Sequence, residues 1–220
     1  MGNIKQFLEG FRRFQQQLYG GNSQLATRLK KGQNPQVLVI SCSDSRVDPA
    51  LLTDCAPGDI FTVRNVANLV PPYEPDNAYH GVSAALEYAV CVLRVADIIV
   101  LGHSSCGGIA GLLDAADGQR VGEFIGHWVD IAADAYARAL ERVGSQDPER
   151  LSRVCGQESI LTSLANLQTF PWLKARLEQG DLKLHGWYFQ IDSGELLGFS
   201  TQTGTFEPLV EGYSLNSEKS

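Results

Sequence analysis

The sequence lacks the features that define several classes of protein. No apolar run approaches the roughly eighteen residues that a bilayer-spanning helix needs, which excludes a membrane-spanning protein. Basic residues are outnumbered, 18 against 25 acidic ones, and the net charge of −7 disfavours general binding to nucleic-acid backbones. The composition, 44% hydrophobic and 20% charged, is typical of a globular domain and excludes disordered, collagen-like and coiled-coil chains.

The N-terminal segment 1–19 has no apolar core of the kind that signal peptides have, because charged residues are mixed with apolar ones along it. Gly2 could suggest N-myristoylation, but Gln6 stands where that signal has Ser or Thr. We therefore predict a cytoplasmic location and leave open enclosure within a bacterial microcompartment.

Cysteine is scarce and odd in number. The five cysteines are spread widely, so metal binding or catalysis explains them better than a disulfide framework. Cys91 lies in the apolar run YAVCVL and is predicted to be a core residue. Cys55 and Cys155 have no His, Cys or acidic residue at metal-ligand spacing, and we predict the same for them. Cys42 and Cys106 remain as candidate ligands.

The first part of the chain is predicted to be helical. Phe7, Phe11 and Phe14 recur at helical spacing, and a second short helix is expected at 24–30. Residues 1–32 would form a helical arm, which could pack on a partner subunit or on the chain's own body. Because no linker interrupts the sequence, 1–220 is taken as one domain that ends in a flexible tail over 208–220.

The rest of the chain predicts an α/β fold. Three runs rich in Val, Ile and Leu, at 37–41, 59–63 and 97–102, indicate strands buried on both faces of a parallel sheet. Helical spacing over 78–94 completes a βαβ unit. Further helices are predicted at 109–116, 122–143, 158–167 and 171–179. The Asp-Ser-Gly at 192–194 indicates a hairpin. We therefore expect a mostly parallel central sheet, flanked by helices, with a C-terminal edge strand or hairpin.

Two motifs directly follow two of these strands, CSDSR at 42–46 and HSSCGG at 103–108. Strand ends in an open parallel sheet share one edge, so Cys42, His103 and Cys106 would converge there if the strands are neighbours. Two thiolates and one imidazole form a zinc-type ligand set, and three protein ligands leave a catalytic position open. Buried thiols and a core histidine are the alternative, which the joint placement disfavours.

Asp44 and Arg46 follow the first candidate ligand closely. Asp44 could ligate a metal or accept a proton from its bound water, and Arg46 could hold that carboxylate bidentately and keep it ionised. The alternative is a surface ion pair of little consequence. Gly107 and Gly108 precede a predicted helix, where backbone N–H groups favour an anion near the metal.

With RNVANLVPPY at 64–73, EYAV at 87–90, LANLQT at 164–169 and LHGW at 184–187, these motifs make the chain resemble the β-class carbonic anhydrases. The resemblance runs from about Gln33 to Phe206, and the combination of CxDxR with HxxC is highly specific. It implies one Zn²⁺ per chain bound by Cys42, His103 and Cys106. It also implies reversible hydration of CO2 to bicarbonate and a proton, by attack of a zinc-bound hydroxide.

The resemblance further assigns roles around the metal. Asp44, paired with Arg46, would orient the hydroxide. Gln33 would hydrogen-bond bicarbonate. Three apolar or aromatic residues near a dimer interface would give CO2 its seat: Phe61, Val66 and Tyr88. A homodimer or a higher even oligomer is implied, with the N-terminal helices wrapping the partner. Because two thiolates offset the charge of the ion, we expect activity to rise on the alkaline side of neutral.

One feature separates subgroups of the family. Some members have a closed state, in which the Asp leaves its Arg for zinc and bicarbonate binds beside a Trp three residues before the first Cys ligand. Here that position is Val39, although Arg64 of that site is present. With Gln33 and NLVPPY, the chain resembles the plant-like, open subgroup. Two other functions stay open: a zinc hydrolase acting on CS2 or COS, and a non-catalytic zinc-stabilised interaction protein.

Overall fold

The computed structural model describes residues 4–21, 23–119 and 121–211. It divides into two compact units, Met1–Asn34 and Pro35–Ser220, each of which is described here by itself. Most of the predicted tail, 212–220, lies outside the described residues. None of the described helices is long and apolar enough to cross a membrane.

The N-terminal unit contains the two predicted helices, α1 (Ile4–Tyr19) and α2 (Gln24–Lys30). The side chain of Ser23 caps α2 by accepting a hydrogen bond from the N–H of Ala26. Within this unit the apolar face of α1 is exposed: the side chains of Phe7 and Phe11 are more than half accessible. A helix that presents aromatic side chains in this way offers a surface that another element could cover.

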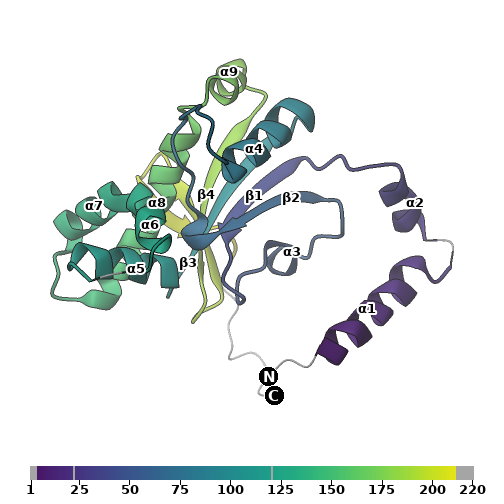
Figure 1. Cartoon of the computed structure of the whole chain (residues 1–220), viewed down its shortest axis with the longest axis horizontal. Helices are drawn as coiled ribbons and strands as arrows, with labels where there is room; N and C mark the ends of the chain where they lie inside the picture. Colours follow the sequence, from purple (N-terminus) through teal and green to yellow (C-terminus); the bar gives the residue numbers. More distant parts are fainter. Residues whose placement is uncertain (1–3, 22, 120, 212–220) are drawn as a thin grey trace. The chain divides into compact units, whose positions relative to one another are not determined.

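The C-terminal unit is built on one six-stranded sheet in the order β2-β1-β3-β4-β5-β6 (Figure 1). The strands β2, β1, β3 and β4 are parallel, and β5 and β6 continue the sheet antiparallel. Their bounds are β1 (Val37–Cys42), β2 (Ile60–Asn65), β3 (Asp97–His103), β4 (Lys183–Gln190), β5 (Glu195–Ser200) and β6 (Thr205–Pro208). The predicted α/β class and the hairpin between β4 and β5 are confirmed, whereas β6 was not predicted.

Both faces of the central strands are buried, which explains why their sequences are almost continuously apolar. Leu38 and Ile40 of β1 belong to the larger core, together with Ile160 of α8. Val39, between them, points to the other face and packs in a smaller cluster with Ile99 of β3. Figure 1 shows α5, α6, α7 and α8 gathered on one side of the sheet.

The helices of this unit differ from the predicted ones mainly at their ends. The observed elements are α3 (Pro49–Leu52), α4 (Gly81–Glu87), α5 (Gly107–Ala116), α6 (Ile125–Val129), α7 (Ala133–Val143), α8 (Pro148–Leu167) and α9 (Pro171–Gln179). The predicted helix 158–167 begins ten residues too late, because Asp147 caps α8 ahead of Pro148 at its first turn. The predicted helix 122–143 is interrupted by a 3₁₀ turn at Asp130–Ala132.

The prediction for Cys91 was wrong. The helix expected over 78–94 passes from α4 into a π-helical turn, Tyr88–Val92, in which Ala89 and Val90 fill the core. Cys91 is exposed, because one turn can bury only the side chains on its inner face. Cys155 is buried as predicted, and Cys55 is partly buried.

Glycine at position 102 lets α8 approach β3 closely, which gives a first prediction. A Cβ there would lie 2.8 Å from Cδ1 and 3.0 Å from Cγ1 of Ile160. Gly102→Ala should therefore lower the free energy of unfolding by about 1–3 kcal/mol through overpacking. Adding Ile160→Val, which removes Cδ1, should restore part of the loss in urea unfolding. Gly81→Ala is the control, because nothing lies within 4 Å of its Cβ position. Equal stability of Gly102→Ala and wild type would contradict this account.

Candidate metal centre

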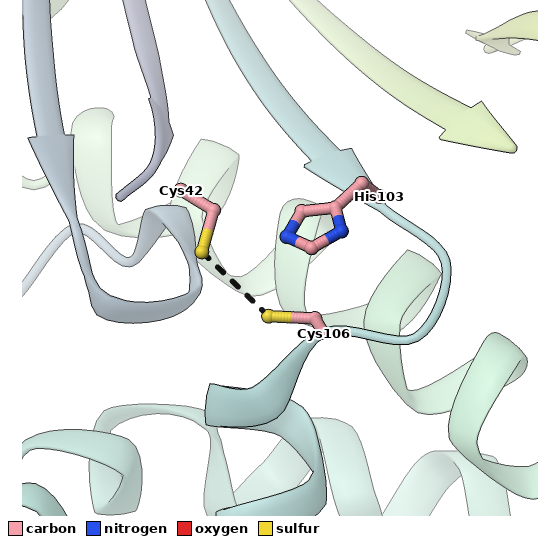
Figure 2. Close-up of side chains that lie close together, drawn as sticks. All are labelled: Cys42, His103 and Cys106. Atoms are coloured by element: carbon pink, nitrogen blue, oxygen red, sulfur yellow. Dashed lines mark hydrogen bonds between the residues drawn. The ribbon is translucent and has the colours of Figure 1, made fainter. Parts of the chain in front are cut away.

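Three predicted ligands meet at the carboxyl edge of the sheet (Figure 2). Cys42 ends β1, His103 ends the neighbouring strand β3, and Cys106 immediately precedes α5. Their ligand atoms all lie within 4.8 Å of one another, and the two Sγ atoms are 3.8 Å apart. All three residues are buried. Parallel pairing thus brings together residues that lie far apart in the sequence, as the two motifs predicted.

The imidazole of His103 is oriented for metal binding. Its Nδ1 lies 2.8 Å from the carbonyl oxygen of Ser104, and this bond fixes Nδ1 as the protonated nitrogen. Nε2 is then left with a free lone pair, and it is buried without a hydrogen-bond partner. An unsatisfied buried polar atom costs about 1–3 kcal/mol. A cation between Nε2 and the two sulfurs would remove that cost, so the donor set fits a zinc ion.

The backbone around the two sulfurs favours thiolates. The hydrogen bond between the two sulfurs lowers the pKa of Cys42 to about 4 and raises that of Cys106, so the pair shares one proton. The backbone N–H groups of Asp44 and Ala67 also lower the pKa of Cys42. Ala67 has the left-handed φ of 62°, a strained conformation for a residue with a Cβ. Sequence reasoning missed this residue, because nothing in its type signals the role.

The backbone N–H groups of Ile109 and Gly108, in the first turn of α5, lower the pKa of Cys106 and oppose the rise that Cys42 causes. Gly108 is required by close packing: a Cβ there would lie 2.7 Å from Cγ1 of Val66 and 2.8 Å from Cβ of Ala67. Gly107 opens the helix and has open space where its side chain would be. The helix N-terminus therefore faces the centre with N–H donors, an arrangement that favours negative charge.

Asp44 and Arg46 form a tight bidentate pair beside the centre. Nε and Nη2 of Arg46 donate to Oδ1 and Oδ2 of Asp44 at 2.9 and 2.7 Å, and the Arg46 backbone N–H donates to Oδ1 at 2.9 Å. Arg46 also donates to the carbonyl oxygen of Ser105 at 3.0 Å. These bonds hold the pKa of Asp44 well below its usual range. Its Oδ2 lies 4.0 Å from Nε2 of His103, so the ionised carboxylate borders the centre.

The predicted pocket residues do not all gather around this centre. Val66 follows β2 and lines a cavity of about 770 Å³ beside Trp128, whose indole N–H donates to the Val66 carbonyl at 2.7 Å. Phe61 and Tyr88 contact each other, with ring centroids 5.9 Å apart. Gln33 belongs to the N-terminal unit. The roles assigned to these residues therefore stay predictions.

The sheet register shows where Phe61 lies. It pairs with Leu38, whereas Asn65 of the same strand pairs with Cys42. Four residues at about 3.3 Å each separate Phe61 from the edge that carries the metal ligands, roughly 13 Å. Within one chain, Phe61 and Tyr88 thus lie at the opposite end of the sheet from the centre.

Comparison with known proteins gives a consistent result. The carbonic anhydrase family model matches residues 37–196. A carbonic anhydrase from Pseudomonas aeruginosa is 39% identical over 208 residues, which cover 94% of this chain and 93% of the relative. The structure of the β-carbonic anhydrase CcaA superposes with a TM-score of 0.87 at 38% identity, covering 94% of this chain and 92% of that one. A tetrameric β-carbonic anhydrase from Sordaria macrospora gives 0.77 at 26% identity, covering 96% and 98%.

A family match over most of the chain defines the class of protein: this is a carbonic anhydrase, an enzyme of CO2 hydration. Within that class, the chain belongs to the β-carbonic anhydrases, to which it is similar in both sequence and structure. The predicted family and the predicted enzyme class are thereby confirmed.

Proposed function

We propose that the chain hydrates CO2 reversibly with one zinc ion held by Cys42, His103 and Cys106. The observation that carries this proposal is the buried, unpartnered Nε2 of His103 next to two sulfur atoms. When bound, the ion supplies a Lewis acid that makes a water molecule nucleophilic near neutral pH. Only three candidate ligands lie together among the described residues, so a bound ion would have a fourth position open to that water.

The Asp44–Arg46 pair orients the nucleophile in this mechanism. Asp44 is ionised and accepts the hydrogen bond of the attacking group, which turns a lone pair towards the carbon of CO2. Arg46 binds both carboxylate oxygens and so keeps Asp44 beside the centre rather than on the ion. The N–H group of Gly107, the first residue of α5, stabilises the negative charge that develops on bicarbonate.

A second copy of the chain completes the substrate pocket in this proposal. Phe61 and Tyr88 lie too far from the metal ligands of their own chain, so their predicted apolar seat for CO2 requires a partner subunit. The exposed aromatic face of α1 supports association. The similar β-carbonic anhydrase from Sordaria macrospora is a tetramer. We therefore propose a homodimer or a higher even oligomer.

The ligand assignment is tested by Cys106→Ala. A site with two protein ligands binds zinc poorly, so this variant should lose both the metal and stopped-flow CO2 hydration activity. Wild type should contain one zinc per chain by elemental analysis. Cys55→Ala is the control, since that thiol hydrogen-bonds to Thr53 outside the cluster. Full zinc occupancy in Cys106→Ala would rule out the assignment, and absence of CO2 hydration by zinc-loaded wild type would rule out the proposed function.

Deleting residues 1–30 tests the role of the arm. If α1 and α2 bind a partner subunit, the shortened chain should associate more weakly and lose activity in parallel. Sedimentation velocity and CO2 hydration measured over the same concentration range would show both effects. A fully active monomer would contradict the proposed oligomer.

The pairing of Asp44 with Arg46, which is the open form of the site, predicts how activity responds to pH and to bicarbonate. Val39 is buried and has no indole N–H to bind bicarbonate, and Arg46 holds Asp44 in place. Activity should therefore rise smoothly on the alkaline side of neutral, without cooperative inhibition by bicarbonate. A crystal grown near pH 7 with an Asp44 oxygen about 2.0–2.2 Å from zinc would show the closed state instead.

A further inference from the structure

The loop that follows β1 curls around the side chain of Arg64. Arg64 lies on β2, where it pairs with Ser41. Its Nε donates to the carbonyl oxygen of Cys42 at 3.1 Å, and its Nη2 donates to those of Asp44 at 2.7 Å and Val47 at 3.1 Å. One guanidinium thus binds backbone oxygens at the beginning, the middle and near the end of the loop.

Asp48 fixes the end of the same loop. Its Oδ2 accepts a hydrogen bond from Nη1 of Arg64 at 3.0 Å. Its Oδ1 caps α3 by accepting from the N–H groups of Ala50 and Leu51 at 3.0 and 3.3 Å. The Arg64–Asp48 ion pair is partly exposed and therefore screened by solvent, so the backbone bonds contribute most of the constraint.

Two of the carbonyl groups that Arg64 binds belong to Cys42 and Asp44, the residues of this loop with proposed roles in the reaction. The side chain of Cys42 is a proposed zinc ligand, and the side chain of Asp44 is proposed to orient the nucleophile. Fixing their carbonyl groups limits rotation of the backbone and so fixes the directions of both side chains. The planar guanidinium suits this task, because its donors diverge towards several acceptors at once, whereas a lysine presents one compact ammonium group.

We propose that Arg64 is a positioning residue for CO2 hydration, one that holds Cys42 and Asp44 in their reactive geometry through the loop. The inference rests on the proposed roles of those two residues. Arg64 binds the loop itself, so its loss should disturb the placement of the Cys42 and Asp44 side chains more than it lowers the stability of the fold. Supporting residues around metal sites typically affect metal affinity or activity by about 10–100-fold.

The first test is Arg64→Lys, which keeps the charge and the aliphatic stem. We expect kcat/KM for CO2 hydration to fall by about 10–100-fold and zinc to be lost faster to a chelator. The melting temperature should change no more than in the control Arg94→Lys, which alters a similar exposed Arg–Asp pair, with Asp181. Wild-type kcat/KM and wild-type zinc retention in Arg64→Lys would overturn the proposal, whatever the melting temperature.

The second test is chemical rescue of Arg64→Ala. Millimolar guanidinium in the assay should restore part of its activity by occupying the vacated position between the carbonyl groups, and should leave wild type unaffected. A folded, zinc-loaded Arg64→Ala that guanidinium does not rescue would also overturn the proposal. Should Arg64→Ala fail to fold, the result for Arg64→Lys decides.

Two further measurements separate this inference from the proposed function. If zinc-loaded wild type does not hydrate CO2, or if Asp44→Asn is as active as wild type, the proposed function fails. If both behave as proposed and the Arg64 variants match wild type, only the positioning role fails.

Discussion

The candidate metal centre depends on the parallel pairing of β1 with β3. Ser41 lies opposite Leu101 in this register, so the last residues of the two strands, Cys42 and Gly102–His103, lie side by side at the carboxyl edge of the sheet. Both strands are buried on both faces, and a slip of one residue would exchange the faces of every side chain in them. The packing of the core therefore fixes the ligand geometry, and no local feature of either loop could do so alone.

Negative charge is concentrated at this edge, and the surrounding backbone compensates for it. The two sulfurs lie 3.8 Å apart, and Oδ2 of Asp44 lies 4.0 Å from Nε2 of His103, which adjoins them. Their partners are N–H groups from the left-handed Ala67 and the start of α5, together with the guanidinium of Arg46. Because Arg46 occupies both oxygens of Asp44, the carboxylate borders the three candidate ligands without joining them. Cys42, Asp44 and Arg46 all lie on the 42–48 segment, so the conformation of this loop sets how the carboxylate and the sulfur are placed.

The separation of Phe61 from the metal ligands has a consequence for assembly. A residue near the amino end of β2 cannot reach the carboxyl edge of its own sheet, because a strand has a fixed rise per residue. A substrate pocket that uses Phe61 and Tyr88 must therefore form between chains. In the proposed oligomer, an element that promotes association, such as the exposed aromatic face of α1, would also complete that pocket.

The sequence by itself predicted the α/β class, the candidate ligands Cys42, His103 and Cys106, and the Asp44–Arg46 pair, because apolar runs and ligand spacing are local properties of the chain. It also predicted α9 to the residue, since Gly180 adopts the left-handed conformation that ends a helix. Only the tertiary structure decided the rest. The exposure of Cys91, the effect of the Ala67 N–H on the pKa of Cys42 and the wrapping of the loop around Arg64 depend on which elements pack together. Such contacts join residues distant in sequence, and no local pattern records them.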